Sequence, residues 1–153
     1  MTNQQTKNQQ TYNFRNLDVW KRAQALTLHI ISTMKSLPND MVVSTIARQL
    51  IASSGSIAAN IAEGHGRFSL PAYRNHLSIA KGSACETDSW LNLLREAGYL
   101  GADVEEGLHR ECLDLVAILT SKIRDLDRLN REQHGARVKD QAAPYGEDEA
   151  LGL

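Results

Sequence analysis

The chain has 153 residues, of which 42% are hydrophobic and 23% charged, and its formal net charge is −1. This length suits one domain with a substantial buried core. Because no apolar run reaches the roughly 18 residues of a membrane-spanning helix, we expect a cytoplasmic protein without membrane contact. Its two cysteines, Cys85 and Cys112, are expected to be reduced thiols on helices.

The N-terminal residues 1–13 are polar, rich in Gln and Asn and without helical period, so we expect them to be disordered. A first helix is predicted over about 16–36, with Asn16 or Asp18 as its cap and Pro38 just beyond its end. Apolar and small residues recur in it at spacings of three and four, as expected for a helix packed on other helices. This stripe is Trp20, Ala23, Thr27, Ile30, Met34 and Leu37.

A second helix is predicted over about 41–63. Its middle part, Ala52 to Ser56, contains only small residues, which favours close approach of a neighbouring backbone. The predicted core stripe is Val43, Ile46, Leu50, Ser54, Ile57 and Ile61.

A third helix is predicted to start at a Ser69 cap, with Pro71 in its first turn, and to end before Gly98. Its core stripe is Tyr73, Leu77, Ala80, Ala84, Thr87, Leu91 and Leu94.

A fourth helix is predicted from Ala102 or Asp103 to about Asn130, because acidic residues near its start suit the positive end of the helix dipole. Residues 133–153 are polar and are predicted to form a disordered tail. The core stripe is Val104, Leu108, Cys112, Leu115, Leu119, Leu126 and Leu129.

Four long helices joined by short corners predict an all-α, antiparallel up-down-up-down four-helix bundle over residues 14–132. Several apolar residues lie beside the core stripes and either widen the core or form a subunit interface. They are Leu26, Ile31, Ile79, Trp90, Leu93, Ile118 and Ile123.

Charge is unevenly distributed along the sequence. Residues 1–82 contain nine Lys and Arg against three Asp and Glu, whereas residues 83–135 contain six against eleven. Clustered cations are what phosphate binding requires, and the alternative explanation is a solvated surface or salt bridges between subunits. The candidates for nucleic-acid binding are Lys21, Arg22, Arg48, Arg67, Arg74 and Lys81.

The stretch from Ser56 to Arg67 forms the end of the second helix and the corner into the third. We expect Gly64 and Gly66 to turn the chain there, because glycine adopts positive φ without a Cβ penalty. Three polar residues are expected to satisfy neighbouring helices or, as the alternative, to form a functional pocket. They are Asn60, Glu63 and Glu86.

These residues also carry a family resemblance, through the block Asn60-Ile61-Ala62-Glu63-Gly64, Gly66-Arg67 and Ser69 and the later Gly82-Ser83, Glu86 and Gly98-Tyr99-Leu100. Over about residues 14–130 the chain resembles the four-helix-bundle proteins encoded by intervening sequences in 23S rRNA genes, a family that includes the accessory variability proteins of diversity-generating retroelements. The resemblance implies a homopentamer without enzymatic activity. It also implies association with RNA or DNA and, in the retroelement branch, with a reverse transcriptase. The sequence departs from this pattern where the family commonly has two arginines, since Ile51 and Ala52 stand there.

An enzyme is the least favoured alternative. Glu106 and His109 have the Glu-x-x-His spacing of di-iron bundles, but the sequence has no second such pair. His109 and Cys112 share a helix face, yet two ligands do not complete a zinc site. His65 has no identifiable catalytic partner. We therefore expect no catalytic residue, metal or cofactor. A nucleic-acid-associated accessory protein and a structural or protein-binding oligomer are the two favoured classes, and a metal-binding bundle enzyme is a distant third.

Overall fold

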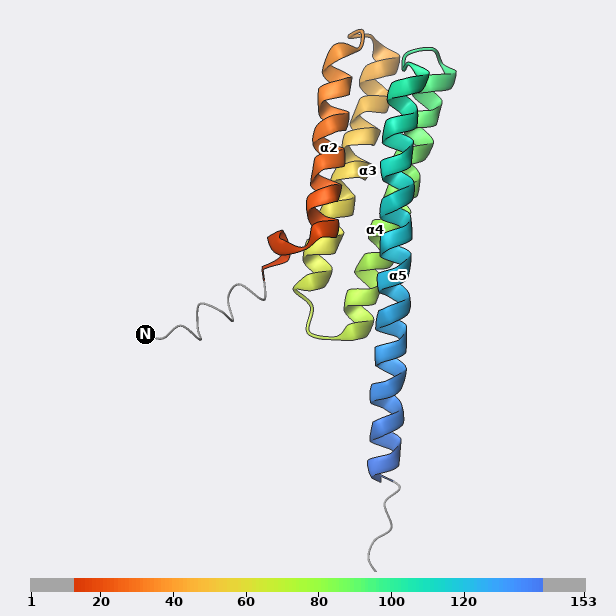
Figure 1. Ribbon diagram of the computed structural model, residues 1–153. Helices are drawn as coiled ribbons and strands as arrows, with labels where there is room; N and C mark the ends of the chain where they lie inside the picture. Colours follow the sequence, from red (N-terminus) through yellow and green to blue (C-terminus); the bar gives the residue numbers. More distant parts are fainter. Residues whose placement is uncertain (1–12, 142–153) are drawn as a thin grey trace, which may run out of the picture.

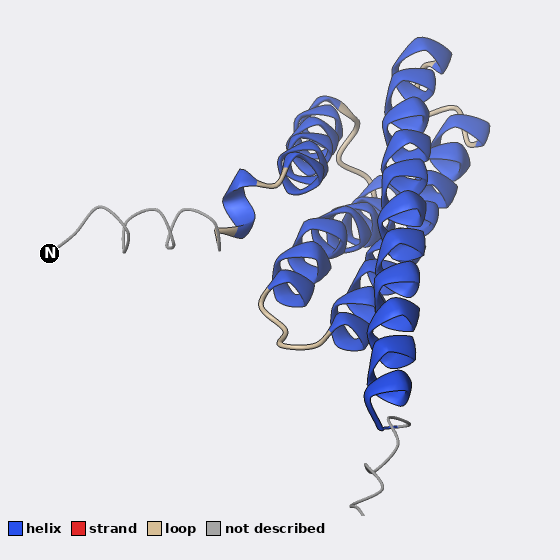
Figure 2. Ribbon diagram, turned by 60° about the horizontal axis from the view of Figure 1, so that its bottom comes forward, coloured by secondary structure: helices blue, strands red, loops and turns tan. Residues whose placement is uncertain are grey.

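The computed structural model describes residues 13–141, with side chains as far as residue 135, and within this range every regular element is a helix (Figures 1 and 2). The elements are η1 (Phe14–Asn16), α2 (Asp18–Ser36), α3 (Met41–His65), α4 (Leu70–Glu96) and α5 (Ala102–Gln141).

The four long helices run alternately up and down, which confirms the predicted bundle. Cross-helix contacts fix the order of the helices around it. Ser83 of α4 donates to Ser56 of α3 at 3.1 Å, and Arg22 of α2 pairs with Asp114 of α5 at 2.7 Å. Since α4 and α5 also pair, through Arg74 and Asp127 at 2.7 Å, each helix packs against the helices before and after it, and α2 closes against α5.

The core follows the predicted stripes of α3 and α4, whereas on α2 only Ala23 and Ile30 of the predicted stripe are buried, together with Val19 and Leu26. All six predicted residues of α3 are buried, as are six of the seven on α4, Tyr73 being half-buried. The stripe of α5 is wrong at both ends, because Val104 is 42% exposed and Leu129 41% exposed. Of the flanking apolar residues, Leu26 and Ile123 belong to the core, while Ile79 and Leu93 are each 45% exposed.

Helices α3 and α4 each begin directly after a residue whose side chain caps the helix. The Asp40 carboxylate accepts a hydrogen bond from the Val43 backbone N–H at 2.8 Å, and the Ser69 hydroxyl accepts one from Ala72 at 3.3 Å, as predicted for Ser69. The cap predicted for α2 was wrong: Leu17 is its N-cap, and no side chain caps it. Asn13 instead caps the short η1 turn, by accepting from the Arg15 N–H at 3.0 Å.

The glycine expectation was wrong for the α3–α4 corner. Helix α3 continues through Gly64 to His65, and Gly66 follows with φ −79°, a conformation open to any residue. The one positive-φ glycine among the described residues is Gly98, with φ 79°, at the end of α4. There Tyr99 N–H donates to Leu94 C=O at 3.0 Å and Gly98 N–H to Arg95 C=O at 2.9 Å, the two hydrogen bonds of a Schellman motif.

Helix α5 is longer than its apolar pattern indicates. It runs to Gln141, beyond Asn130 where the period fades, so the first residues of the predicted tail are helical. Figure 1 shows its last turns extending past the α3–α4 corner. The predictions of disorder for residues 1–12 and 142–153 concern positions outside the described residues. None of the described helices is long and apolar enough to span a membrane.

Candidate functional site

His76 of α4 is the centre of a polar cluster at the α3–α4 corner. Its Nδ1 lies 3.4 Å from Asn60 Oδ1, and its Nε2 accepts a hydrogen bond from Arg67 Nε at 3.2 Å. Glu63 pairs with the other end of the Arg67 guanidinium and lies 3.7 Å from His76 Nε2. Three members of the Asn60–Arg67 sequence block therefore meet one histidine from the next helix.

The hydrogen bonds of this corner cluster (Asn60, Glu63, Arg67 and His76) assign the protons. Arg67 can only donate, so Nε2 of His76 must be the unprotonated ring nitrogen. The ring proton then lies on Nδ1 and is donated to the Asn60 side-chain oxygen, while Asn60 Nδ2 donates to the Ser56 carbonyl at 2.9 Å. With this tautomer, both ring nitrogens of His76 have a hydrogen-bond partner within the cluster.

Gly64 lets α4 come close enough for these contacts. A Cβ atom at Gly64 would lie 2.8 Å from His76 Cβ and 2.9 Å from Tyr73 Cδ2, both shorter than carbon contacts allow. The glycine is therefore required by packing against α4 and not by a turn. In contrast, nothing lies within 4 Å of a Cβ built at Gly55, so close packing within the chain does not explain that glycine.

The polar contacts continue along the α3–α4 interface into the core. Ser83 Oγ donates to Ser56 Oγ at 3.1 Å, and one turn further Thr87 Oγ1 donates to Ser53 Oγ at 3.1 Å. Such buried hydroxyl pairs satisfy each other and fix the register of two helices. Glu86 is not part of this row, because it accepts from the Trp90 indole N–H at 3.3 Å.

Four of the six candidate cations are paired with carboxylates. Arg22 bridges α2 to α5 by contacting Glu111 at 3.0 Å and Asp114 at 2.7 Å, and these hydrogen bonds raise the pKa of Arg22. Arg74 binds Asp127 across the α4–α5 interface at 2.7 Å. The other two paired cations, Arg67 and Lys21, bind carboxylates close in sequence.

The remaining two candidates have no carboxylate partner among the described residues. Arg48 donates a hydrogen bond to Thr45 at 3.4 Å, and Lys81 of α4 makes no ion pair. The six candidates lie on three helices and one corner, so they do not form a single cluster. Their positions along the bundle axis, and not contacts among them, indicate where a positively charged surface lies.

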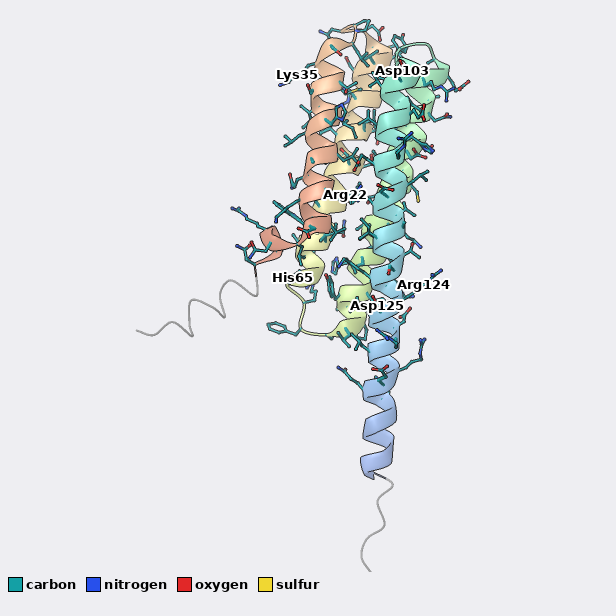
Figure 3. The ribbon with its side chains drawn as sticks, in the orientation of Figure 1. Arg22, Lys35, His65, Asp103, Arg124 and Asp125 are labelled. Atoms are coloured by element: carbon teal, nitrogen blue, oxygen red, sulfur yellow. The ribbon has the colours of Figure 1, made fainter. Side chains whose placement is uncertain are left out.

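Charge is separated along the bundle axis. We place the boundary between two halves of the bundle at the level of the Ser56–Ser83 and Arg22–Asp114 contacts. The corner half then consists of residues 13–21, 56–83 and 116–135, and the distal half of residues 22–55 and 84–115. The corner half contains nine Lys and Arg and five Asp and Glu, whereas the distal half contains five and nine. In Figure 3, Arg124 lies toward the corner end and Asp103 at the opposite end.

Four sequence candidates belong to the positive half. The nine corner-half cations are Arg15, Lys21, Arg67, Arg74, Lys81, Lys122, Arg124, Arg128 and Arg131. Arg22 and Arg48 lie in the distal half. The sequence division at residue 82 hid this polarity, because each half of the bundle combines segments from all four helices.

The Glu106 and His109 pair lines a groove of about 360 Å³ between α4 and α5 in the distal half. His109 Nδ1 lies 2.6 Å from Asp88 Oδ1, and this hydrogen bond raises the pKa of His109. The buried Glu105 pairs with Arg95 at 3.3 Å. No group of three possible metal ligands occurs among the described side chains.

The other chemically notable side chains face the interior. Burial raises the pKa of the Cys112 thiol to about 12, so it is uncharged at neutral pH. His65 packs edge-on against Tyr73, and its Nε2 is buried without a hydrogen-bond partner. Neither arrangement supplies an activated nucleophile with its base.

Sequence reasoning missed His76, the residue that the corner cluster surrounds. Its signal was available in the hairpin itself, because residues equally distant from the α3–α4 corner face each other across it. Asn60 and His76 stand at nearly equal distances from that corner.

Comparison with known proteins agrees with this architecture. One solved structure, a protein of unknown function from the S23 ribosomal protein family of Bacteroides thetaiotaomicron, is similar with 28% sequence identity and a TM-score of 0.65. The match covers 69% of this chain and 97% of that one. A search of curated proteins gives no significant match. Residues 15–121 match the 23S rRNA-intervening sequence proteins, and the chain belongs to that family.

Proposed function

We propose that this protein is a non-enzymatic, oligomeric accessory protein that binds nucleic acid through the corner half of its bundle. The observation that carries the proposal is the axial charge separation, with nine cations against five carboxylates in the corner half. Phosphate groups attract such a surface, and the negative distal half repels them, so the polarity also sets the orientation of binding.

The ion pairs of the corner half do not neutralise this excess. Lys81, Arg124 and Arg131 have no carboxylate partner among the described side chains. Exposed ion pairs such as Arg67 with Glu63 contribute little stability and exchange readily for other partners. Arg67 and Arg74 therefore stay available to phosphate, at the cost of competing with Glu63 and Asp127.

An electrophoretic mobility shift at two salt concentrations tests this function. Wild-type protein should shift RNA or DNA at low salt and lose affinity at higher salt, because bound phosphates release counterions. The variant Arg67→Glu, Arg74→Glu, Lys81→Glu should bind both more weakly and with a smaller salt dependence. Binding that is independent of salt, or that is unchanged by the three charge reversals, contradicts the proposal.

A second candidate function is a structural or protein-binding oligomer that does not use nucleic acid. It is favoured by the outer faces of α3 and α4, where Ile79 and Leu93 are exposed and the open positions Gly55 and Gly82 permit close approach. A reverse transcriptase is the protein partner that the resemblance to retroelement accessory proteins suggests.

The oligomer itself is proposed to be a homopentamer. Light scattering after gel filtration should give a mass of about 85 kDa for five 17.0 kDa chains. A mass of one chain would contradict the assembly while leaving the nucleic-acid proposal to its own test.

A further inference from the structure

Phe68 lies at the tip of the α3–α4 corner with its side chain fully in solvent, at a relative exposure of 109%. No other large apolar residue among the described ones is as exposed; Met41 follows with 82%. A fully exposed phenylalanine ring gains nothing for folding, since it buries no apolar surface. Contact with a binding partner, and not folding of this chain, therefore explains its exposed position.

Neither of the other two corners exposes an aromatic ring fully, although Met41, the first residue of α3, is exposed beside the α2–α3 corner. Leu37 packs against the core at the α2–α3 corner, and Leu100 is buried at the α4–α5 corner, with Tyr99 half-buried beside it. Both of these corners belong to the negative distal half. The exposed ring thus occurs at the one corner that lies at the positive end of the molecule.

The loop holds Phe68 between two anchored residues. The Arg67 N–H donates to the Gly64 carbonyl at 3.0 Å, and the Ser69 side chain caps α4. The Arg67 side chain contacts Glu63 and His76 in the corner cluster. A ring presented by a short anchored loop loses little conformational entropy when a partner binds it.

We propose that Phe68 is a base-stacking residue for single-stranded nucleic acid, with phosphates held by the surrounding corner-half cations. This inference rests on the proposed function and specifies the form of its ligand. Single strands present unstacked bases, and aromatic side chains bind them by stacking beside positively charged residues. The bases of a duplex are already stacked on each other, so a ring at a loop tip cannot reach their faces.

The charge of the corner half selects this occupant over an uncharged one. An apolar pocket of a protein partner would use only the ring, whereas a nucleic acid also uses the excess of nine cations over five carboxylates around it. A negatively charged membrane surface is the remaining alternative. Binding to anionic lipid vesicles distinguishes it from nucleic-acid binding.

The experiment measures fluorescence anisotropy of labelled single-stranded RNA and DNA oligonucleotides and of their duplexes, with the full chain. Phe68→Ala should weaken single-strand binding about 5- to 150-fold, the range for loss of one stacked base, and leave weaker duplex binding unchanged. Phe68→Trp should retain affinity. Phe68→Leu should lose it as Phe68→Ala does, because leucine keeps apolar volume but has no aromatic face. A 2-aminopurine base in the oligonucleotide should be quenched by wild-type protein and not by Phe68→Leu.

Because Phe68 touches no core residue, these variants should fold as wild type does, and circular dichroism checks this. If wild type binds and Phe68→Ala binds equally well, the stacking role is wrong while the proposed function stands. Wild-type affinity in Phe68→Leu, or an equal loss of duplex binding, also overturns the stacking role. If wild type binds neither form but binds anionic lipid vesicles, both proposals are wrong.

Discussion

Gly64 and His76 together determine how closely α3 and α4 approach at the corner. The β-carbon of His76 and the ring and backbone carbonyl of Tyr73 pass directly over the glycine, and the His76 imidazole lies between Asn60 and Arg67. The sequence block that identifies the family is thus explained at the residue scale by one close contact and the polar side chains that surround it.

Gly64→Ala should destabilise the protein by about 1–3 kcal/mol, because the added methyl group overlaps His76 Cβ and Tyr73 and forces α4 outward. Urea unfolding followed by circular dichroism measures the change. Gly107→Ala is the matched control in α5, since a Cβ there meets nothing within 4 Å and alanine favours the helix. Equal stability of Gly64→Ala and wild type would refute the packing argument.

His109 gives stability a dependence on pH. Its hydrogen bond to Asp88, aided by Glu105 and Glu106, raises the pKa of folded His109 above that of the unfolded chain. The charged imidazole therefore stabilises the fold below about pH 6.5, and this stabilisation is lost as pH rises through the higher folded pKa.

Melting temperatures between pH 5.5 and 8.5 test this. His109→Gln should be less stable than wild type at low pH, with the difference shrinking as pH rises, and Asp88→Asn should give the same trend. A constant difference across this range would mean that the pair contributes packing and not charge.

At the scale of elements, the helices begin and end through different capping interactions and backbone conformations. α3 ends without a positive φ, α4 ends with Gly98 at φ 79°, and α3 and α4 begin with side-chain caps. The sequence pattern located all four helices, because apolar spacing and Pro38 are local signals. It placed the positive-φ glycine at the wrong corner. A glycine near a helix end looks the same in sequence whether it adopts a positive φ, as Gly98 does, or allows close packing of a neighbouring helix, as Gly64 does.

Gly98→Ala should cost about 1–2 kcal/mol, since an L-residue is strained at that positive φ. Gly66→Ala should cost much less, because its φ of −79° suits alanine and its Cβ would lie at an ordinary 3.4 Å from the Glu63 carbonyl. Thermal unfolding of the two variants compares them directly. The reverse order of stabilities would show that Gly66 and not Gly98 is the strained position.

For the whole molecule, the axial separation of charge matters more than the net charge of −1. Composition could not reveal it, because the chain passes along the bundle four times and each passage contributes to both halves. The candidate cations were chosen from the sequence, and four of the six lie in the corner half. The partners that bind Arg22 and Arg74 could not be predicted, since Asp114 and Asp127 come from a helix distant in sequence.

The most direct test compares the salt dependence of nucleic-acid affinity for two triple charge reversals. The corner triple is Arg67→Glu, Arg74→Glu, Lys81→Glu, and the distal triple, with the same change in net charge, is Lys35→Glu, Arg48→Glu, Arg110→Glu. For single strands, the corner triple should weaken binding and reduce the slope of log affinity against log salt by roughly 2, given about 0.7 per phosphate contact. The distal triple should leave that slope unchanged. Equal losses from the two triples would contradict binding by the corner half.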